Sequence, residues 1–318
     1  MNTVSKVVVV GSLNSDITLG VPRLPAPGET LLANSSSSSP GGKGANQAIA
    51  AARLGADVTI LGKIGMDSRA DDILKGLRDA GVNAEHLVRD ANTTSGMAFI
   101  MVDNSGRNMI VVWPAANAEF SKADLLPRER LISESDALIT QFEIPLDVAA
   151  GALRVAKQRN VLTVCNPAPA ITVGREFLEM VDILIPNETE ASVLTGIEVG
   201  TVADAMEASS RLRTMGAERV VVTMGHQGAV YIGPEGKWHS PVFPVKSIDT
   251  TGAGDAFVAA FTVAWLKNAD PRESLLYASA VGAVATTVTG AQLPVDCGQS
   301  VGRLLEGEGI APILADRT

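Results

Sequence analysis

Short runs of apolar residues recur along the chain and alternate with stretches of helical periodicity. The first run, four valines at 7–10, ends at Gly11 and is typical of a strand buried on both faces. Strands separated by amphipathic helices indicate βαβ units, so we expect an α/β fold around a mostly parallel sheet. The other predicted strands are 137–140, 161–164, 183–185 and 220–223, and the clearest predicted helices are 146–159, 175–180 and 202–215.

Two segments depart from that alternation. Residues 17–40 are rich in Pro, Gly and Ser, whereas residues 96–113 predict a β-hairpin with its turn at 103–106. We expect both to form a small β-sheet lid over the strand ends, within a single domain that spans residues 1–318. The five-serine run at 35–39 indicates a flexible surface loop, with a strand of the lid as the alternative.

Composition narrows the class of protein. The 318 residues carry 26 Lys and Arg against 35 Asp and Glu, a net charge of −9, so nucleic acid is not expected as the main partner. Cys165 and Cys297 are the only cysteines, which we expect to be reduced and buried, and no zinc-type spacing occurs. No apolar segment approaches the length of a membrane span, so a cytoplasmic protein without a membrane partner is expected.

The strongest local motif is the segment Asp-Thr-Thr-Gly-Ala-Gly-Asp at 249–255, which directly precedes an apolar helix predicted at 256–266. Glycines allow a tight turn, and the free N–H groups at a helix start attract anions. A carboxylate at Asp255 would be placed to take a proton from a hydroxyl nucleophile. The alternative makes Asp255 a helix N-cap and the glycines an ordinary turn.

A second glycine-rich segment, Gly-Gly-Lys-Gly-Ala-Asn-Gln at 41–47, leads into a helix predicted at 45–54. It is not a Walker A motif, because Ser37 and Gly44 stand where that motif needs Gly and Ser or Thr. What remains is a helix start that presents Lys43 and Asn46. Taken alone, Lys43 could equally be a solvated surface lysine.

Polar side chains follow several of the predicted strands. Asn14 and Asp16, two residues apart, would point to one side of an extended segment and suit adjacent sugar hydroxyls, although an Asx turn is the alternative. Asn187 is a helix-cap candidate, and together with Glu190 it could also hold Mg²⁺-bound water. Because ligands bind at the carboxyl ends of parallel strands, we expect these residues on one active face.

Taken together, these motifs resemble the ribokinase-like (PfkB) family of carbohydrate kinases from about residue 7 to residue 305. Each motif is short, but their joint occurrence in this order is specific. The family also implies an α/β/α sandwich around the central sheet. Besides 41–46 and 249–255, the segments that carry the resemblance are 11–16, 27–30, 166–169, 186–190 and 290–292.

The resemblance assigns roles to residues at matching positions. Asp255 matches the catalytic base, and Gly252, Ala253 and Gly254 match the anion hole for the γ-phosphate. The positions that match sugar-binding residues are Asn14, Asp16, Gly42, Lys43, Asn46 and Glu143, with Asp255. Those that match the nucleotide site are Asn187, Glu190, Thr223, Gly225, Gly228, Gly254 and Ser279.

A monovalent-cation site, usually for K⁺, is also implied. Its matching positions are the side chains of Asp249 and Thr251 and the carbonyls of Ala285, Val288 and Gly290. Three positions depart from the family pattern. Pro294 replaces an expected serine ligand, Ser279 replaces a larger residue beside the adenine, and Trp113 stands in an unusual lid sequence.

The activity implied by the resemblance is ATP-dependent, Mg²⁺-assisted phosphorylation of the 5-hydroxyl of D-ribose. Related kinases for 2-deoxyribose, another furanose or a nucleoside are the alternative within the class. A catalytically silent sugar-binding regulator is the alternative outside it, and the presence of Asp255 argues against that role. Apolar residues on both faces of 97–102 further predict a homodimer joined through the lid.

Overall fold

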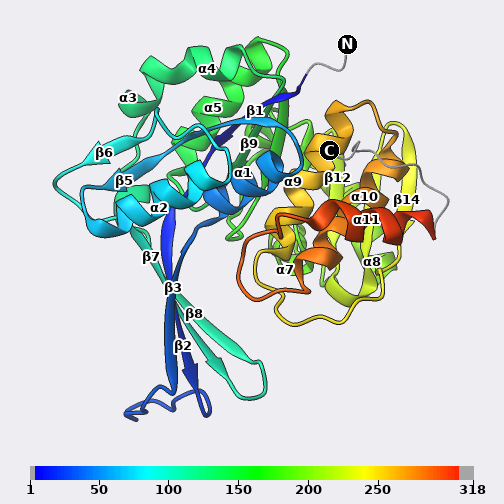
Figure 1. Ribbon diagram of the computed structural model, residues 1–318. Coiled ribbons are helices and arrows are strands. Elements are labelled where there is room, and N and C mark those ends of the chain that lie inside the picture. The colour runs from blue at the N-terminus through cyan, green and yellow to red at the C-terminus, as the bar shows by residue number, and fades with distance from the viewer. Residues whose placement is uncertain (1–3, 308–318) are drawn as a thin grey trace.

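The computed structural model describes residues 4–307 and builds them around one large sheet (Figure 1). This sheet has eight strands in the order β14-β13-β12-β11-β10-β9-β1-β4. Every neighbouring pair from β4 to β12 is parallel, and β13 and β14 pair antiparallel at the edge. The strands are β1 (Lys6–Val10), β4 (Asp57–Leu61), β9 (Ala137–Gln141), β10 (Leu162–Asn166), β11 (Ile183–Leu184), β12 (Arg219–Thr223), β13 (Ala229–Gly233) and β14 (Gly236–Ser240). The prediction of an α/β fold with a mostly parallel sheet is confirmed.

Helices cover both faces of the sheet, and successive side chains along a strand point alternately toward the two helical layers. Val7 and Val9 belong to the core on one face, whereas Val8 and Val10 belong to the core on the other. The first layer consists of α1 (Lys43–Arg53), α2 (Ser68–Asp79), α9 (Ala253–Leu266), α10 (Pro271–Ala285) and α11 (Cys297–Glu306). The second consists of α3 (Lys122–Leu125), α4 (Glu129–Ser133), α5 (Leu146–Gln158), α6 (Arg175–Leu178), α7 (Glu188–Thr195) and α8 (Val202–Met215).

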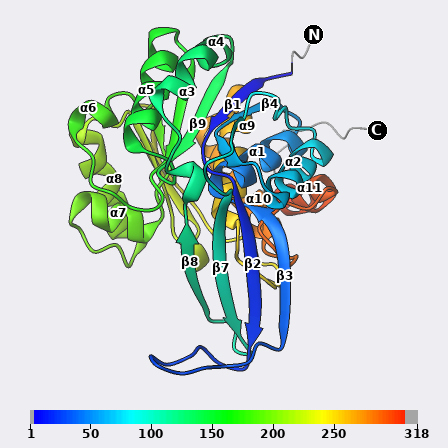
Figure 2. The same ribbon diagram turned by 90° about the vertical axis from the view of Figure 1, so that its left-hand side faces the viewer.

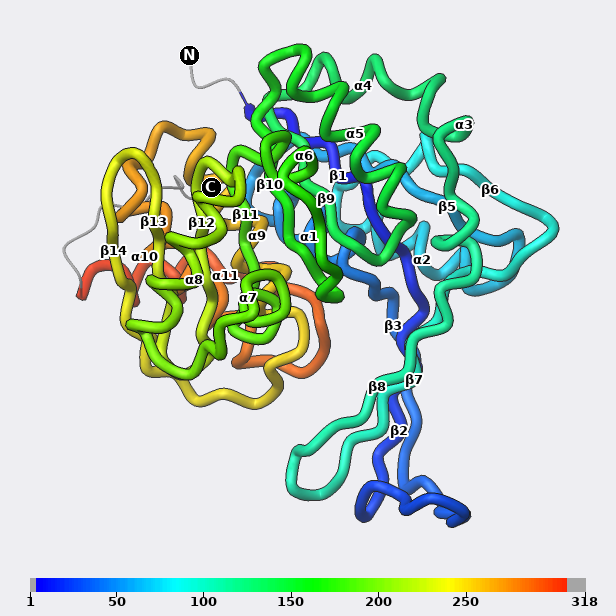
Figure 3. Tube along the Cα trace, turned by 180° about the vertical axis from the view of Figure 1, so that it is seen from behind, coloured from blue at the N-terminus to red at the C-terminus, as the bar shows by residue number. Residues whose placement is uncertain are grey.

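A second sheet of four strands, in the order β3-β2-β7-β8, extends away from the body of the molecule (Figures 2 and 3). Its strands are β2 (Asn14–Val21), β3 (Ser35–Gly41), β7 (Gly96–Asp103) and β8 (Asn108–Trp113). The predicted hairpin is therefore present as β7 and β8. A further two-stranded sheet joins β5 (Lys63–Gly65) to β6 (Val88–Asp90).

The predicted flexible loop at 35–39 is wrong, because the five serines form most of β3. Their backbone pairs antiparallel with β2, from Gly20 opposite Ser35 to Asn14 opposite Gly41. The serine side chains are exposed, so no apolar alternation marks the strand. Backbone hydrogen bonds to β2, which the composition of the segment does not reveal, hold it extended.

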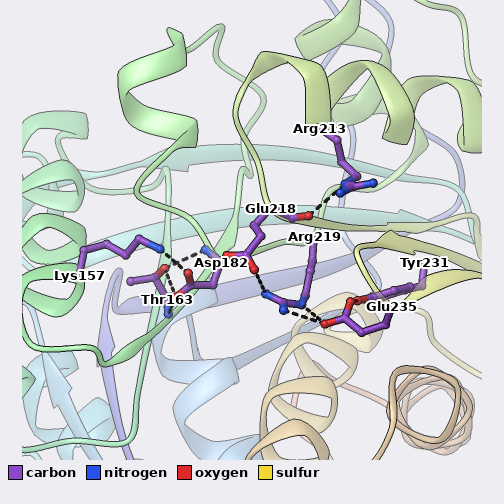
Figure 4. A network of polar contacts seen from close by, with 8 residues as sticks. All are labelled: Lys157, Thr163, Asp182, Arg213, Glu218, Arg219, Tyr231 and Glu235. Atoms are coloured by element: carbon purple, nitrogen blue, oxygen red, sulfur yellow. Dashed lines mark hydrogen bonds and ion pairs between the residues drawn. The ribbon is translucent and has the colours of Figure 1, made fainter.

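A cluster of polar contacts fastens the amino ends of β10, β11 and β12 (Figure 4). Asp182, just before β11, accepts hydrogen bonds from the backbone N–H and the hydroxyl of Thr163 at 2.8 and 2.9 Å and pairs with Lys157. Arg219 at the start of β12 pairs with Glu218 and Glu235. These contacts fix the strands at the end opposite to the polar residues described below.

Both cysteines are free and buried, in agreement with the sequence. Within residues 4–307 no helix is long and apolar enough to cross a lipid bilayer.

Candidate active site

Asp255 lies in the first turn of α9, at the centre of the polar residues that follow the parallel strands. The helix begins after Gly252, which is its N-cap with φ 75°, so the interpretation of Asp255 as the cap is wrong. The buried carboxylate accepts hydrogen bonds from Asn46 Nδ2 at 3.0 Å and from Gln47 Nε2 at 2.9 Å. α1 and α9 thus meet at the Asp255 side chain, which lies 209 residues from Asn46 in the sequence.

Two glycines bring the start of α1 onto the end of β1. A Cβ at Gly42 would lie 2.8 Å from the Asn14 nitrogen, and one at Gly44 would lie 2.6 Å from the Gly11 carbonyl carbon. Any larger residue at these positions would push the helix away. The close approach places Lys43 and Asn46 beside the β1–β2 connection, as the glycine-rich segment predicts.

The residues predicted to bind sugar gather where β2 starts. Glu143 accepts hydrogen bonds from the Ser12 hydroxyl at 2.6 Å and from the Lys43 backbone N–H at 3.3 Å. Asn14 and Asp16 are buried residues of β2, so the Asx-turn interpretation is wrong. The buried oxygens Asp16 Oδ1 and Asn46 Oδ1 have no hydrogen-bond partner, which is unfavourable unless a ligand supplies one.

Asn117 fixes the orientation of the Asn14 amide from a segment far away in sequence. Its Nδ2 donates to Asn14 Oδ1 at 2.8 Å and to the Leu13 carbonyl at 3.1 Å, while its Oδ1 accepts from the Leu13 N–H at 2.9 Å. Since Asn14 Oδ1 is occupied, its N–H₂ group remains to bind an acceptor. Asn14 thereby presents a hydrogen-bond donor and Asp16 an acceptor without a protein partner.

Asp16 has a strongly perturbed titration. Burial raises the pKa of its carboxyl to about 7, and the nearby carboxylates of Glu143 and Asp255 add to the shift. The group therefore changes charge near neutral pH. A ligand that donates hydrogen bonds to it would favour the ionised form.

A cavity of about 200 Å³ opens next to Asp255 and joins residues from five parts of the chain. Asn187 caps α7, and it forms a capping box with Glu190, whose backbone N–H donates to Asn187 Oδ1 at 2.8 Å. The lining residues are Lys43, Asn166, Ile185, Asn187, Glu190, Thr223, Gly252, Gly254, Asp255 and Val258. A larger hollow of about 530 Å³, between α2 and residues 81–89, holds none of the predicted site residues.

The charges around this cavity are predominantly negative. Burial raises the pKa of Glu190, and the neighbouring Asp255 and Glu188 add to the shift although hydrogen bonding from Asn187 opposes it. Burial lowers the pKa of Lys43, but Asp255, Glu143 and Glu190 outweigh that effect and keep it above its ordinary value. Lys43 is therefore a cation that lines the cavity, and the interpretation as a solvated surface lysine is wrong.

The residues predicted to bind a monovalent cation lie in two segments, 249–251 just before α9 and 285–290 at and after the end of α10. Asp249 accepts hydrogen bonds from the Thr251 and Gly290 N–H groups, both at 2.9 Å, and these bonds hold the pKa of Asp249 below its usual value despite its burial. Ala285 ends α10, and Val288 and Gly290 follow it. The backbone of the next residue lies close to the turn, since the Ala291 carbonyl oxygen would be 2.1 Å from a Cβ at Gly252.

Some predicted residues lie outside the cavity lining. Gly225 begins the short helix η3 (Gly225–Gln227) after β12 and Gly228 is its C-cap, whereas Ser279 lies within α10 with its buried hydroxyl unpartnered. Three residues of the network have no role assigned from the sequence: Gln47, Asn117 and Asn166, although Asn166 follows a predicted strand and its position is expected on the active face. Gln47 adjoins Asn46 in the glycine-rich segment, and that adjacency was the available signal.

The cavity joins a glycine turn at a helix start, a buried carboxylate and a lysine, which are the groups that phosphoryl transfer to a small molecule requires. The model of the pfkB family of carbohydrate kinases matches residues 4–297. The chain belongs to the pfkB carbohydrate kinase family.

Individual relatives agree with the family assignment. The chain is 39% identical over 299 residues to the ribokinase of Haemophilus influenzae, covering 94% of this chain and 97% of that protein. It is also 39% identical to the bifunctional ribokinase/ribose-5-phosphate isomerase A of Fructilactobacillus sanfranciscensis, covering 90% of this chain but only 54% of that longer protein. The structure of Arabidopsis thaliana ribokinase complexed with ribose and ATP matches with a TM-score of 0.86 at 31% identity, over 96% of this chain and 99% of that one.

Proposed function

We propose that this chain transfers the γ-phosphoryl group of ATP to the 5-hydroxyl of D-ribose, giving ribose 5-phosphate and ADP. One observation carries the proposal: two unpartnered buried oxygens lie close to the Asp255 carboxylate, one on Asn46, which donates to it, and one on Asp16, whose pKa its charge raises. Groups in this arrangement suit a polyhydroxylated ligand held next to a base. The ribokinase relatives support ribose as that ligand.

The chemistry follows from positioning and charge. Asp255 takes the proton of the primary hydroxyl as the oxygen attacks phosphorus, and the O–P bond to ADP breaks as the new one forms. Backbone N–H groups of Gly252, Ala253 and Gly254 at the start of α9 stabilise the charge on the transferring phosphoryl group. Lys43 offsets further negative charge from its place in the cavity wall.

Two cations fit the residues present. Glu190 presents a buried carboxylate to the acidic cavity, which suits Mg²⁺ held through water and phosphates, and Mg²⁺ would offset phosphate charge there. Asp249, the Thr251 hydroxyl and the carbonyls of Ala285, Val288 and Gly290 would supply only oxygen donors, which suits a K⁺ ion. Pro294 supplies no hydroxyl to that set.

The proposed function is tested by ADP release from purified protein with a panel of sugars, in Mg²⁺ with K⁺, Na⁺ or choline as the monovalent ion. We expect turnover with ribose and strong rejection of 2-deoxyribose, because a site that hydrogen-bonds a hydroxyl leaves polar groups unpaired when that hydroxyl is missing. Preference for 2-deoxyribose or a nucleoside would replace ribose as substrate. Sugar binding without any ADP release would identify a regulator instead.

Ribose affinity is expected to depend on the ionisation of Asp16. The pKa of Asp16 is about 7 in the folded protein against an ordinary 3.8. The protonated group therefore contributes to the free energy of unfolding of the sugar-free protein at acid pH, and this contribution is lost as pH rises from 3.8 through 7. Because sugar hydroxyls donate to the carboxylate, ribose binds the ionised form and its Kd rises about tenfold per pH unit below 7. Calorimetry at several pH values, in buffers of different ionisation enthalpy, measures the accompanying proton release. Asp16→Asn is the control, and equal proton release by this variant would contradict the assignment.

We propose that the second sheet is a lid that closes over the sugar. The register places Asp16, Ala98 and Val112 on one face of the sheet, together with Asn14 and Ile100. That face carries the predicted sugar-binding residues, and the lid strands are anchored beside Asp255 through α1. Closure of such an element excludes water during transfer.

The opposite face of this sheet is apolar and favours a homodimer. Strand pairing groups Ile17, Phe99 and Val111 there, and Phe99 and Val111 are 39% and 57% exposed. A self-complementary apolar face fits a two-fold symmetric pair.

Sedimentation equilibrium at micromolar concentration is expected to show a dimer for the wild type and a monomer for Phe99→Asp, since a buried charge would oppose association. Leu126→Asp, at a 65% exposed position on η2 (Leu126–Arg128), is the matched control and should remain dimeric. A monomeric wild type, or a dimeric Phe99→Asp, would refute the lid interface.

A further inference from the structure

Gln47 is completely buried on α1 and touches the proposed catalytic base. Its Nε2 donates to Asp255 Oδ1 at 2.9 Å and to Asn166 Oδ1 at 3.3 Å. Its Oε1 accepts a hydrogen bond from Gln141 Nε2 at 2.6 Å. Every polar atom of this side chain is therefore bonded within the protein.

These bonds fix which end of the Gln47 amide faces Asp255. An amide rotated by 180° would turn its oxygen toward the carboxylate and its N–H₂ group toward the N–H₂ group of Gln141, and both contacts are repulsive. The Asp255 carboxylate, which can only accept, thus determines the orientation of the Gln47 amide, and Gln47 in turn holds one carboxylate oxygen in place.

Asn46 occupies the other carboxylate oxygen but has a different role. It donates to Asp255 Oδ2 at 3.0 Å, and its own Oδ1 has no partner and is free for a ligand. Gln47 has no atom free for a ligand. Of the two amides on Asp255, only Gln47 is devoted entirely to holding the carboxylate.

The same amide connects the base to the nucleotide side of the cavity. Asn166, which accepts the second N–H of Gln47, donates through Nδ2 to the Ile185 carbonyl at 2.9 Å and to Glu190 Oε2 at 3.5 Å. The network therefore runs without interruption from Asp255 to Glu190 through two side-chain amides.

We propose that Gln47 is a positioning residue for phosphoryl transfer, whose amide holds the Asp255 carboxylate in the rotamer that meets the attacking hydroxyl. The inference rests on the proposed function, because it assigns Gln47 a part in the same reaction. Lys43, Asp16 and Glu190 are the charged groups that act on Asp255 from the surrounding elements, and none of them replaces this fixed hydrogen bond.

The test is Gln47→Met, which keeps the length of the side chain and removes its donors. We expect kcat to fall on the order of 10- to 100-fold, the usual cost of losing a hydrogen bond to a charged group. The KM for ribose and the Kd of a non-hydrolysable ATP analogue should change less than about threefold, because Gln47 presents no atom to either ligand.

A double-mutant cycle separates positioning from general structural damage. If Gln47 acts through Asp255, Gln47→Met will change the residual kcat of the Asp255→Asn protein by less than about threefold. Loss of structure alone would lower kcat by the same factor in both backgrounds, and that result would overturn the proposal. Thr262→Val, which removes a buried hydroxyl from α9 that donates only to the Val258 carbonyl, should keep wild-type kcat.

Two further results keep the inference distinct from the proposed function. Should Gln47→Met fail to fold by circular dichroism, Gln47→Leu carries the test, because leucine also has no donor for Asp255 and kcat should fall by a similar factor. An active wild type with a folded Gln47 variant of equal kcat would overturn the inference alone. A wild type that phosphorylates no sugar of the panel would overturn the proposed function, and the inference with it.

Discussion

Asp255→Asn is expected to bind ribose and ATP while turning over on the order of 10²–10⁴-fold more slowly than the wild type. An asparagine side chain has the shape of the carboxylate but cannot accept the proton of the sugar hydroxyl. Asp255 is buried, and Asn46 and Gln47 donate to its two carboxylate oxygens, so this carboxylate is held in a fixed position. Steady-state ADP release and calorimetric titration with each ligand measure the two halves of the expectation.

Asp270→Asn is the matched control for this variant. Asp270 caps α10 by accepting a hydrogen bond from the Glu273 N–H at 2.7 Å, and asparagine caps helices equally well. The control removes an acidic group at a helix start away from the cavity, so its kcat should equal that of the wild type. An Asp255→Asn protein that retains more than half of the wild-type kcat would show that another group accepts the proton.

Five neighbouring strands of the large sheet, β1 and β9 to β12, could be predicted from sequence because they are largely buried on both faces, whereas β4, β13 and β14 were not predicted. A run such as the four valines of β1 is continuous only where side chains enter two cores, so composition alone reveals the strand. β3 could not be predicted in the same way. Its serines are exposed, and its conformation depends on pairing with β2, which no periodicity along the chain records.

The candidate site likewise combines motifs that are visible locally in the sequence with partner residues that are distant in it. Segments 41–47 and 249–255 combine glycines with polar residues over a few positions, so their chemistry is visible locally. The partners that orient them are distant: Asn117 lies 103 residues from Asn14, and Gln47 lies 208 from Asp255. A lone Asn or Gln has no sequence signature, and only the topology of the sheet brings these amides onto the residues they hold.

Whether Asp255 caps a helix or lies inside one could not be decided from sequence either. Both alternatives need a carboxylate within a few residues of the helix start, and they differ only in where the first turn begins. The left-handed conformation of Gly252 settles this, because it starts α9 at Ala253, two residues before Asp255, and the carboxylate meets α1.

Gly252→Ala is expected to lower kcat by about 100-fold and to reduce the free energy of unfolding. Two costs coincide at this position. An L-residue at φ 75° is strained by about 1–2 kcal/mol, and the new Cβ would lie 2.1 Å from the Ala291 carbonyl oxygen, which belongs to backbone and cannot swing aside. The turn must therefore move, and with it the N–H groups proposed to hold the transferring phosphoryl group, where loss of one donor costs on the order of 10²–10³-fold.

Gly196→Ala separates the two costs. Gly196 ends α7 with φ 74°, nearly the same backbone conformation, but no atom lies within 4 Å of an added Cβ. This control should lose stability through backbone strain alone and keep the kcat of the wild type. Thermal unfolding and ADP release, measured on both variants, distinguish backbone strain from displacement of the turn before α9. If Gly252→Ala loses no more activity than Gly196→Ala, the turn before α9 does not hold the phosphoryl group, and the anion-binding role would have to pass to Lys43.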